Sequence, residues 1–440
     1  MSEWKKVKLG DYIDVLSGFA FKSKDFSDSG IPVIKIKNVS PPCISLEDLS
    51  FVPEPIAFQN SRYILKKGDI LIAMTGSHIN QIASVVGRVG RVRYDDITVL
   101  NQRVGKIINK NDDLSDIDFI YYYLSQYEVK VELAQKAGGA ANQANISPSD
   151  IKNLLFPCPP IEVQHRIATI LSRYDTLIEN YQKQIKLLEE AAQRLYKEWF
   201  VDLRFPGYEN VKMVDGLPEG WEKKTLGEVF SYVRGKSYSS SEISDEGCLM
   251  VNLKNIQAFG GYKRDAEKRF VGEYKSEQTL KKGDLVLGVT DMTQERRLVG
   301  HVALIPDFDE PVTFSMDLIK IVPYSIPTSF LYCAMRYGDI SKQISPLANG
   351  VNVLHLKPEA MMGIVMTVPR KELVEKFCLV VEEMINKILK KPISNPPSHR
   401  GPRPLAAEAD GRGDGSVTKM KWKYNENELL YEKERIARRL

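Results

Sequence analysis

Apolar residues along the chain follow two different periods, which predict short strands and several helices. Short apolar runs bounded by Gly, Asn and Ser turn residues predict strands in both halves of the chain. The predicted strands are Val33–Ile36, Ile70–Met74, Val104–Ile108, Met250–Leu253, Leu285–Val289 and Leu318–Val322. A helix follows the strands in each half, over Phe119–Lys136 and over Thr328–Ile344. Strands that precede helices predict the α+β fold class.

Between these halves, residues 161 to 200 carry apolar side chains at intervals of three and four. This stripe is typical of a long helix that forms a coiled coil. Roughly 40 helical residues would span about 60 Å. Pro160 suits the first turn of this helix, and Pro206-Gly207 ends it. A second helix of the same kind begins at Glu372.

The chain contains an internal duplication. A shift of 217 aligns residues 4–39 with 221–256 without a gap, and 11 of those 36 positions are identical, where unrelated chains would give roughly two. The identities include Trp4 with Trp221, Gly10 with Gly227, Gly18 with Gly235, Gly30 with Gly247, and Asn38 with Asn255. The string LKKGD occurs at 65–69 and again at 280–284, and we predict that its aspartates accept hydrogen bonds within β-turns. A repeat of about 155 residues is a duplicated domain rather than a solenoid unit.

These patterns predict two similar domains related by a pseudo-two-fold axis and separated by long helices. The predicted regions are a first domain over 1–158, a central spacer helix over 159–205, a second domain over 206–370, the start of a second spacer helix over 371–390, and an atypical Pro/Gly-rich, disordered tail over 391–440.

Composition narrows the class of protein only slightly. The 440 residues are 43% hydrophobic and 27% charged, which is ordinary for a globular protein. The net charge of +4 permits a DNA partner without requiring one. The five cysteines are scattered and form no Cys-x-x-Cys pair, so neither a zinc site nor a disulfide framework is expected. Because there is no signal peptide and no apolar run of about 18 residues, we expect a cytoplasmic protein.

The sequence contains no recognised catalytic signature. It has neither a GxxxxGK[ST] phosphate loop nor a glycine-rich fingerprint for a dinucleotide or S-adenosylmethionine. The five histidines show no metal-ligand spacing. We therefore predict no catalytic residue and no metal ligand in this chain.

Polar side chains gather after the two LKKGD strings, at two strand ends and in two glycine-containing loops. Amides, hydroxyls and guanidiniums read base edges, and Lys and Arg contact phosphates. The candidate DNA-binding residues of the first copy are Lys35, Lys37, Asn38, Thr75, Ser77, His78, Asn80, Gln81, Arg88, Arg91, Arg103, Asn142, Gln143 and Asn145. Those of the second copy are Asn252, Lys254, Asn255, Thr290, Thr293, Gln294, Arg296, Arg297, Asn349 and Asn352. The alternative for each is an ordinary surface residue or turn cap.

Over about residues 4–390 the chain resembles the specificity subunit of type I restriction-modification systems. The resemblance is carried by Trp4–Gly10, Trp221–Gly227, the two KKGD turns, Pro159–Gln164, Leu195–Phe200 and Phe205–Gly207. It implies two target-recognition domains, each reading one half of a split, asymmetric DNA site, alternating with two helices that pack antiparallel as a coiled coil. It also implies that methyltransferase subunits dock on the helices and that restriction subunits join the complex. S-adenosylmethionine, ATP and Mg²⁺ would then be bound by those partners.

Residues 391–440 depart from the family pattern, because the second spacer helix would continue there. We expect weaker methyltransferase docking at that end. Two other function classes stay open on the sequence alone. One is an enzyme that fuses DNA recognition with modification, and the other is a coiled-coil interaction scaffold that does not bind DNA.

Overall fold

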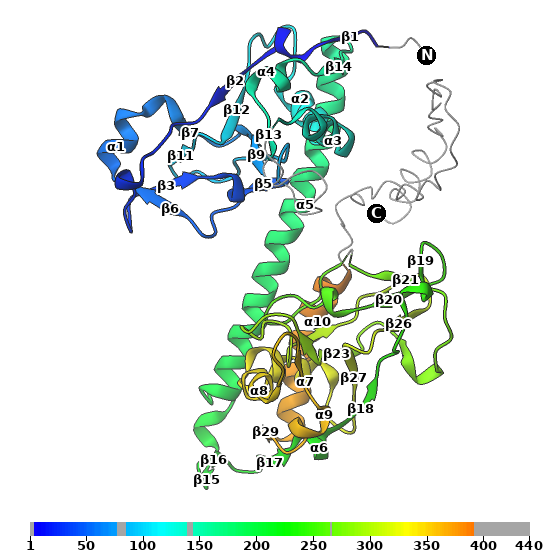
Figure 1. The fold of residues 1–440 in the computed structure, drawn as a ribbon. Helices are drawn as coiled ribbons and strands as arrows, with labels where there is room; N and C mark the ends of the chain where they lie inside the picture. The colour runs from blue at the N-terminus through cyan, green and yellow to red at the C-terminus, as the bar shows by residue number, and fades with distance from the viewer. Residues whose placement is uncertain (1–3, 77–84, 139–143, 265, 391–440) are drawn as a thin grey trace. The chain divides into compact units, whose positions relative to one another are not determined.

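The computed structural model of the protein describes residues 4–76, 85–138, 144–264 and 266–390. The predicted tail, residues 391–440, lies outside these residues. Each half of the described chain places a series of strands before its helices, as the colours of Figure 1 show. The predicted α+β fold class is confirmed.

The first domain contains two larger sheets. One consists of β2 (Ile13–Ser17), β12 (Val104–Asn109), β8 (Ile70–Ala73), β10 (Val89–Arg91), β5 (Cys43–Ile44) and β4 (Val39–Ser40), in that spatial order. The other consists of β6 (Ser50–Val52), β3 (Ile31–Ile34), β11 (Thr98–Leu100) and β7 (Ile64–Leu65), in that order. A two-stranded ribbon pairs β1 (Lys6–Lys8) with β14 (Leu155–Pro157).

The second domain repeats this arrangement. One sheet has the order β18 (Phe230–Arg234), β27 (Leu318–Pro323), β23 (Leu285–Gly288) and β25 (Val302–Leu304). The other has the order β19 (Ile243–Ser244), β21 (Lys268–Phe270), β20 (Cys248–Val251), β26 (Val312–Phe314) and β22 (Thr279–Leu280). The ribbon pairs β17 (Glu222–Thr225) with β29 (Val365–Val368). Because β18-β27-β23-β25 matches β2-β12-β8-β10, the duplication seen in the sequence is a duplication of the fold.

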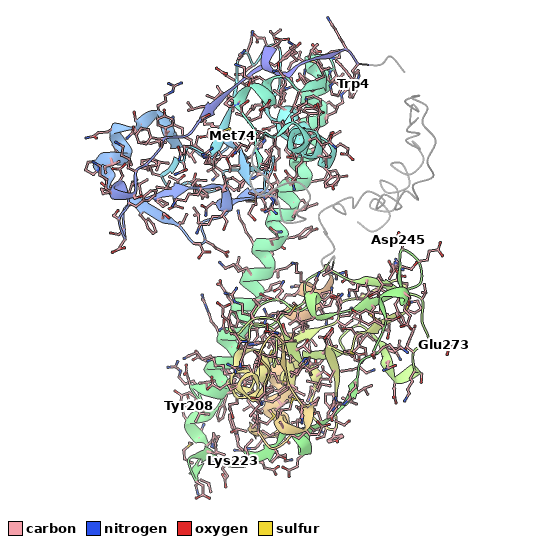
Figure 2. The ribbon with its side chains drawn as sticks, viewed as in Figure 1. Trp4, Met74, Tyr208, Lys223, Asp245 and Glu273 are labelled. Carbon is pink, nitrogen blue, oxygen red and sulfur yellow. The ribbon has the colours of Figure 1, made fainter. Side chains whose placement is uncertain are left out.

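The central strand of each main sheet is apolar on both faces for a structural reason. In β8, Ile70 and Ile72 belong to one hydrophobic core, whereas Leu71 and Ala73 belong to another. Met74, labelled in Figure 2, extends the buried run. Successive side chains of a strand point to opposite faces, so a sheet that separates two cores needs a continuous apolar run.

The LKKGD strings form matching turns before β8 and β23. The side chain of Asp69 accepts a hydrogen bond from the backbone N–H of Lys66 at 2.8 Å, and that of Asp284 accepts one from Lys281 at 2.9 Å. The expected role of both aspartates as turn acceptors is confirmed.

Each helix predicted as one segment in the two domains is a pair of helices. The pairs are α2 (Ile117–Leu124) with α3 (Tyr127–Lys136), and α7 (Thr328–Tyr337) with α8 (Ile340–Ile344). The Ser125 hydroxyl donates to the carbonyl of Tyr121 at 2.7 Å, and Gln126 is extended, which ends α2. Gly338 is extended and ends α7. Side-chain bonds back to the helix and an extended residue stop a helix that the apolar pattern alone would continue.

The predicted long helix is confirmed as α5 (Ile161–Tyr196), which continues as a π-helical turn, η5 (Lys197–Val201). Its beginning packs on α2 of the first domain, and its end packs on α7 and on α10 (Lys371–Lys390). The helices α5 and α10 run in opposite directions (Figure 1). The shorter elements are α1 (Glu54–Gln59), α4 (Pro148–Lys152), α6 (Leu226–Val229), α9 (Pro358–Met361), β15 (Met213–Val214) and β16 (Leu217–Pro218).

Gly18 and Gly235 occupy matching places at the ends of β2 and β18. A Cβ atom on Gly18 would lie 2.2 Å from the backbone oxygen of Asn101, and one on Gly235 would lie 2.0 Å from that of Ser315. A side chain cannot fit where two backbone segments pass so closely. This approach explains why both copies carry glycine here.

Replacing Gly235 with alanine is expected to lower the free energy of unfolding by roughly 1–3 kcal/mol, because the neighbouring backbone must move. Gly363→Ala is the matched control, since a Cβ at Gly363 meets no atom within 4 Å. Urea unfolding followed by circular dichroism measures both variants. Equal losses in the two variants would show that the close approach does not constrain Gly235.

No helix in the parts of the chain that the structure describes is long and apolar enough to span a bilayer.

Candidate nucleic-acid interface

The structure brings together two loop regions that are far apart in each copy. In the first domain, β9 (Thr75–Gly76) pairs with β13 (Ala144–Asn145). In the second domain, β24 (Thr290–Asp291) pairs with β28 (Leu354–His355). In each domain, the strand that begins the loop after the LKKGD strand therefore pairs with a strand beside the glycine-containing loop, and we treat each such pair as one candidate surface.

In the first domain this surface is anchored by a side-chain hydrogen bond. The hydroxyl of Thr75 donates to Oδ1 of Asn145 at 2.8 Å. Thr75 is buried, whereas Asn145 is half-buried. The candidates Ser77, His78, Asn80, Gln81, Asn142 and Gln143 lie outside the described residues.

In the second domain, one buried carboxylate organises the loop after β24. Asp291 is fully buried, and its oxygens accept from the backbone N–H of Thr293 at 2.8 Å, of Leu298 at 2.6 Å and of Val299 at 3.2 Å. The Thr293 hydroxyl also donates to Asp291 at 2.8 Å. Burial alone would raise the pKa of Asp291, but these hydrogen bonds outweigh it and hold the pKa below its usual range. The carboxylate therefore stays charged and fixes both ends of the loop.

Several candidates of the second domain project from this loop and its neighbour. Thr293, Gln294, Arg297, Asn349 and Asn352 are all exposed. Nε2 of Gln294 donates to the carbonyl of Val351 at 2.9 Å, which ties the two loops together. The amide and hydroxyl groups of this surface are suited to base edges.

Two apolar side chains accompany these polar groups. Met292 is 77% exposed and Val351 is 88% exposed, and they belong to the same pair of loops. They give the candidate surface an apolar component beside its amides and hydroxyls. The sequence analysis did not identify either residue, because a single apolar residue in a loop carries no distinctive pattern.

The three candidate asparagines at the strand ends are not available to DNA. Asn38, Asn252 and Asn255 are buried. Nδ2 of Asn38 donates to the carbonyl of Glu47, and that of Asn255 donates to the carbonyl of Lys263, both at 2.9 Å. The amide of Asn252 bonds Asn255 and Ala266. These residues cap turns inside each domain, so the turn-cap alternative holds for them and we withdraw them as DNA contacts.

Three further candidates are also engaged inside the domains. Arg91 is 7% exposed, and it pairs with Asp118 at 2.6 Å and stacks over the ring of Tyr121. Thr290 is buried and donates to Asp317 at 3.1 Å, and Thr75 is bonded as described above. A buried, paired side chain cannot reach a phosphate or a base, so these three are withdrawn as well.

The remaining cations differ in accessibility. Lys37, Arg103 and Lys254 are exposed, and Arg88 and Arg296 are half-buried. Lys35 is half-buried, where its ammonium donates to the hydroxyl of Ser50 at 2.8 Å and lies over the ring of Phe26. Contact of these residues with DNA stays a prediction.

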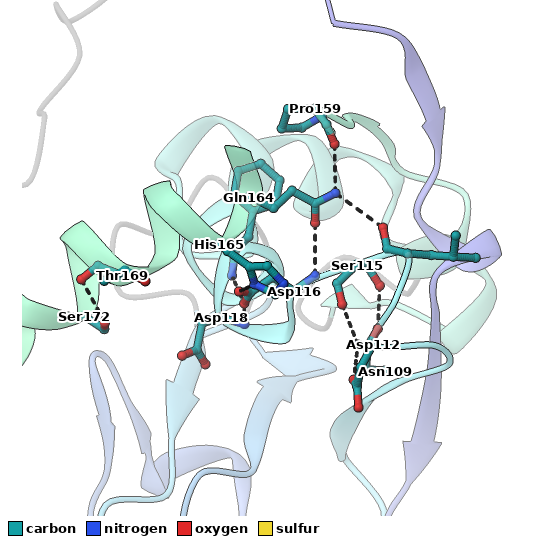
Figure 3. Close-up of polar contacts among 12 residues, drawn as sticks. Asn109, Asp112, Ser115, Asp116, Asp118, Pro159, Gln164, His165, Thr169 and Ser172 are labelled. Atoms are coloured by element: carbon teal, nitrogen blue, oxygen red, sulfur yellow. Dashed lines mark hydrogen bonds and ion pairs between the residues drawn. The ribbon is translucent and has the colours of Figure 1, made fainter. Parts of the chain in front are cut away.

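The junction between the first domain and α5 is a polar site that the sequence analysis did not identify. Gln164 is fully buried, and Figure 3 shows its amide between two segments. Its Oε1 accepts from the backbone N–H of Asp116 at 3.0 Å, and its Nε2 donates to the carbonyl of Pro159 at 2.9 Å. Nδ1 of His165 lies 2.5 Å from the Asp116 carboxylate. The motif Pro159–Gln164 therefore fixes the start of the helix to the domain.

A second contact holds α5 to the first domain farther along the helix. Arg93 lies 3.4 Å from the carboxylate of Asp175 and 3.1 Å from that of Glu179. The hydroxyl of Tyr122 donates to Asp175 at 2.8 Å. This contact joins a loop, α2 and the spacer helix, and it adds hydrogen bonds and ion pairs to the apolar packing of Ile167 and Ala168 against the core of the domain.

Comparison with known proteins agrees with this arrangement. Residues 1–190 match the family described as "Type I restriction modification DNA specificity domain". The chain is 25% identical over 381 residues to the type I restriction enzyme MjaVIII specificity subunit of Methanocaldococcus jannaschii, covering 84% of this chain and 83% of that protein. It is 25% identical to the MjaIX specificity subunit of the same organism, covering 88% of each.

A solved structure has a similar fold. The crystal structure of a type I restriction-modification system S subunit from M. genitalium has a TM-score of 0.51 to this chain at 18% identity. The match covers 89% of this chain and 97% of that chain, so it extends over both domains and the helices.

Proposed function

We propose that the chain is a type I restriction-modification specificity subunit, which recognises a bipartite, asymmetric DNA site and directs partner methyltransferase and restriction subunits to it. The observation that carries this proposal is the duplicated domain with diverged loops. The main sheets have the same strand order, but Gly76 of β9 corresponds to the buried anchor Asp291 of β24. Two similar scaffolds with different contact loops suit two different half-sites.

The helices are the proposed docking surface for methyltransferase subunits. Along the middle of α5, Ile170, Leu171, Tyr174 and Leu177 are each between 37% and 43% exposed. An exposed apolar stripe on a charged helix is typical of a surface that a partner covers. On α10, Leu379 is 74% exposed. We expect docking to be weaker at the end of α10, as the sequence analysis predicts.

The chemistry of the complex belongs, in this proposal, to the partners. The chain reads DNA in the cytoplasm and makes or breaks no covalent bond, whereas the partner subunits bind S-adenosylmethionine, ATP and Mg²⁺. This part of the proposal rests on the family and on the absence of a catalytic signature in the sequence.

The test is to map methylated adenines in DNA from cells that carry the chain together with its partner subunits. We expect a gapped, two-part motif that disappears when the chain is deleted. Exchanging residues 292–297 for the corresponding loop of a relative should alter one half of the motif and leave the other unchanged. A motif that persists without the chain, or one that is a single uninterrupted block, would contradict the proposal.

A DNA titration of the purified chain tests the recognition step alone. Binding that weakens steeply with salt supports phosphate contacts. No measurable affinity at low ionic strength would instead favour a coiled-coil scaffold that does not bind DNA.

A further inference from the structure

The second domain contains a pocket of about 480 Å³ next to its candidate DNA loop. The loop after β24 contributes Glu295 and Arg296 to the lining, and the α7–α8 hairpin contributes Arg336, Ser341 and Lys342. The pocket opens to solvent, because the side chain of Lys342 is 78% exposed and that of Glu295 is 62% exposed. A group on a bound molecule can therefore enter it.

Two hydrogen-bond donors in this pocket are buried without a partner. They are Nε of Arg296 and the hydroxyl of Ser341, and Ser341 is only 3% exposed. Nearly all buried polar atoms in folded proteins are paired, since an unpaired one loses its hydrogen bonds to water without replacement. In the described part of the chain few buried side-chain atoms lack a partner, and two of them line this one pocket.

The backbone at Arg296 is also unusual. Its φ angle of 53° lies in the left-handed region, which is costly for a residue with a long side chain. The hydrogen bonds that the backbone N–H groups of Thr293, Leu298 and Val299 donate to the Asp291 carboxylate hold the loop on both sides of Arg296. The fold therefore maintains an uncommon backbone conformation at a residue that lines the pocket and has an unpaired donor.

The charge of the lining favours an anion. Three cations, Arg296, Arg336 and Lys342, face one carboxylate, Glu295. Some of this charge is already compensated, since Arg336 pairs with Glu189 at 2.9 Å and Lys342 pairs with Asp339 at 3.0 Å. Glu295 itself pairs with Arg297 at 2.6 Å. Arg296 pairs with no carboxylate in the described ranges and is the cation best placed to bind a ligand.

We propose that this pocket binds a phosphate group, with Arg296 and Ser341 donating hydrogen bonds to its oxygens, and that the phosphate belongs to the backbone of DNA held at the adjacent loop. The inference rests on the proposed function for the source of the phosphate, but the pocket chemistry stands on its own residues. A phosphate contact of this kind fixes the register of a domain on the duplex, and the base contacts of Thr293 and Gln294 would then add specificity.

The first arm of the test uses inorganic phosphate and the full-length chain without DNA. Thermal unfolding is followed in phosphate and in chloride at equal ionic strength. We expect phosphate to raise the midpoint of wild type, because a ligand that binds the folded state stabilises it. Arg296→Gln and Ser341→Ala should each weaken phosphate binding roughly tenfold or more, since each loses a bond to a charged group.

Two controls separate binding from folding. Arg370→Gln makes the same substitution at an exposed arginine of the same domain that does not line the pocket, and should keep the response to phosphate. Ser341→Ala in chloride alone should not lower the midpoint, because its hydroxyl has no partner to lose. If wild type gains nothing from phosphate, or if Arg296→Gln responds as wild type does, the pocket is not a phosphate site.

The second arm measures duplex DNA affinity as a function of salt. Arg296→Gln should reduce the slope of log K against log salt concentration by about 0.9, the value for one phosphate contact. Ser341→Ala, which removes a neutral donor, should weaken binding without changing the slope. A phosphate response lost in Arg296→Gln together with an unchanged slope would overturn DNA as the source and leave a free anion. Wild type that responds to phosphate but does not bind DNA would count against the proposed function instead.

Discussion

Replacing Phe377 with alanine is expected to lower the free energy of unfolding of the second domain by about 3–5 kcal/mol, the usual cost of emptying a buried phenylalanine site. The Phe377 side chain of α10 is fully buried. Its ring centroid lies 4.9 Å from that of Phe200, 5.8 Å from that of Trp199 and 6.1 Å from that of Tyr196. It also meets Phe330 of α7, so one side chain joins three helices.

Guanidinium unfolding followed by tryptophan fluorescence measures this loss, because Trp199 belongs to the cluster. The control is Leu379→Ala, two residues along the same helix, where the side chain is 74% exposed. That change should stay within about 0.5 kcal/mol of wild type. If both variants unfold at the same denaturant concentration, the aromatic cluster does not hold α10 to α5.

The second large effect is expected at Asp291. In Asp291→Asn, the amide can still accept from Thr293 through one oxygen, but its NH₂ group faces the N–H groups of Leu298 and Val299. Two buried donors then lose their acceptor, which should cost roughly 2–5 kcal/mol in total. We expect loss of the loop conformation and with it most of the second domain's contribution to DNA affinity. Urea unfolding and DNA titration measure the two effects.

The effect of Asp291→Asn should depend on pH in a definite direction. Because the pKa of Asp291 is lowered in the folded protein, the ionised carboxylate stabilises the fold at all pH values above its unfolded pKa of about 3.9. That contribution is lost as the pH falls through the lower, folded pKa. The difference in stability between wild type and variant should therefore be full at neutral pH and shrink below about pH 4.

Glu295→Gln is the matched control for Asp291→Asn. It changes a carboxylate of the same loop, but that side chain is 62% exposed and pairs only with Arg297 at the surface. An exposed pair contributes little to stability, so this variant should unfold as wild type does. If the gap between Asp291→Asn and wild type stayed constant down to pH 2, the ionised form of Asp291 would not be what holds the loop.

Part of the candidate surface could be predicted from the sequence, because equivalent loops occur at the same place in both copies of the repeat. The loops after the two LKKGD strings stand out as polar segments that differ at matching positions. The structure pairs the strand that begins each loop with a strand beside the glycine-containing loop of its own copy. The equivalence extends to the register, since Thr75 pairs with Asn145 as Thr290 pairs with His355. The burial of Asn38 and Asn255 was not predictable, because the same Lys-Asn pair fits a surface contact or an internal cap.

The two copies also differ where their sequences agree. Trp4 is 44% exposed, whereas its counterpart Trp221 is 9% exposed and packs with Phe205 and Leu373. The difference arises because the second tryptophan meets the segment that follows the spacer helix. Identity between two copies therefore does not show that two side chains have the same surroundings.

The sequence alone predicted those elements whose conformation depends on neighbouring residues. The long helix, the apolar central strands and the glycines of the repeat follow from periodicity and from backbone geometry, which neighbouring residues set. Whether each polar candidate is buried or exposed was decided by tertiary structure, because its partners lie far away in the sequence. Arg91 is neutralised by Asp118, and Gln164 is enclosed by Asp116 and Pro159. Nε of Arg296 is left unpaired in a pocket that Ser341 of a distant helix also lines. The free energy of burying a polar group depends on those partners, and no pattern within a short segment contains them.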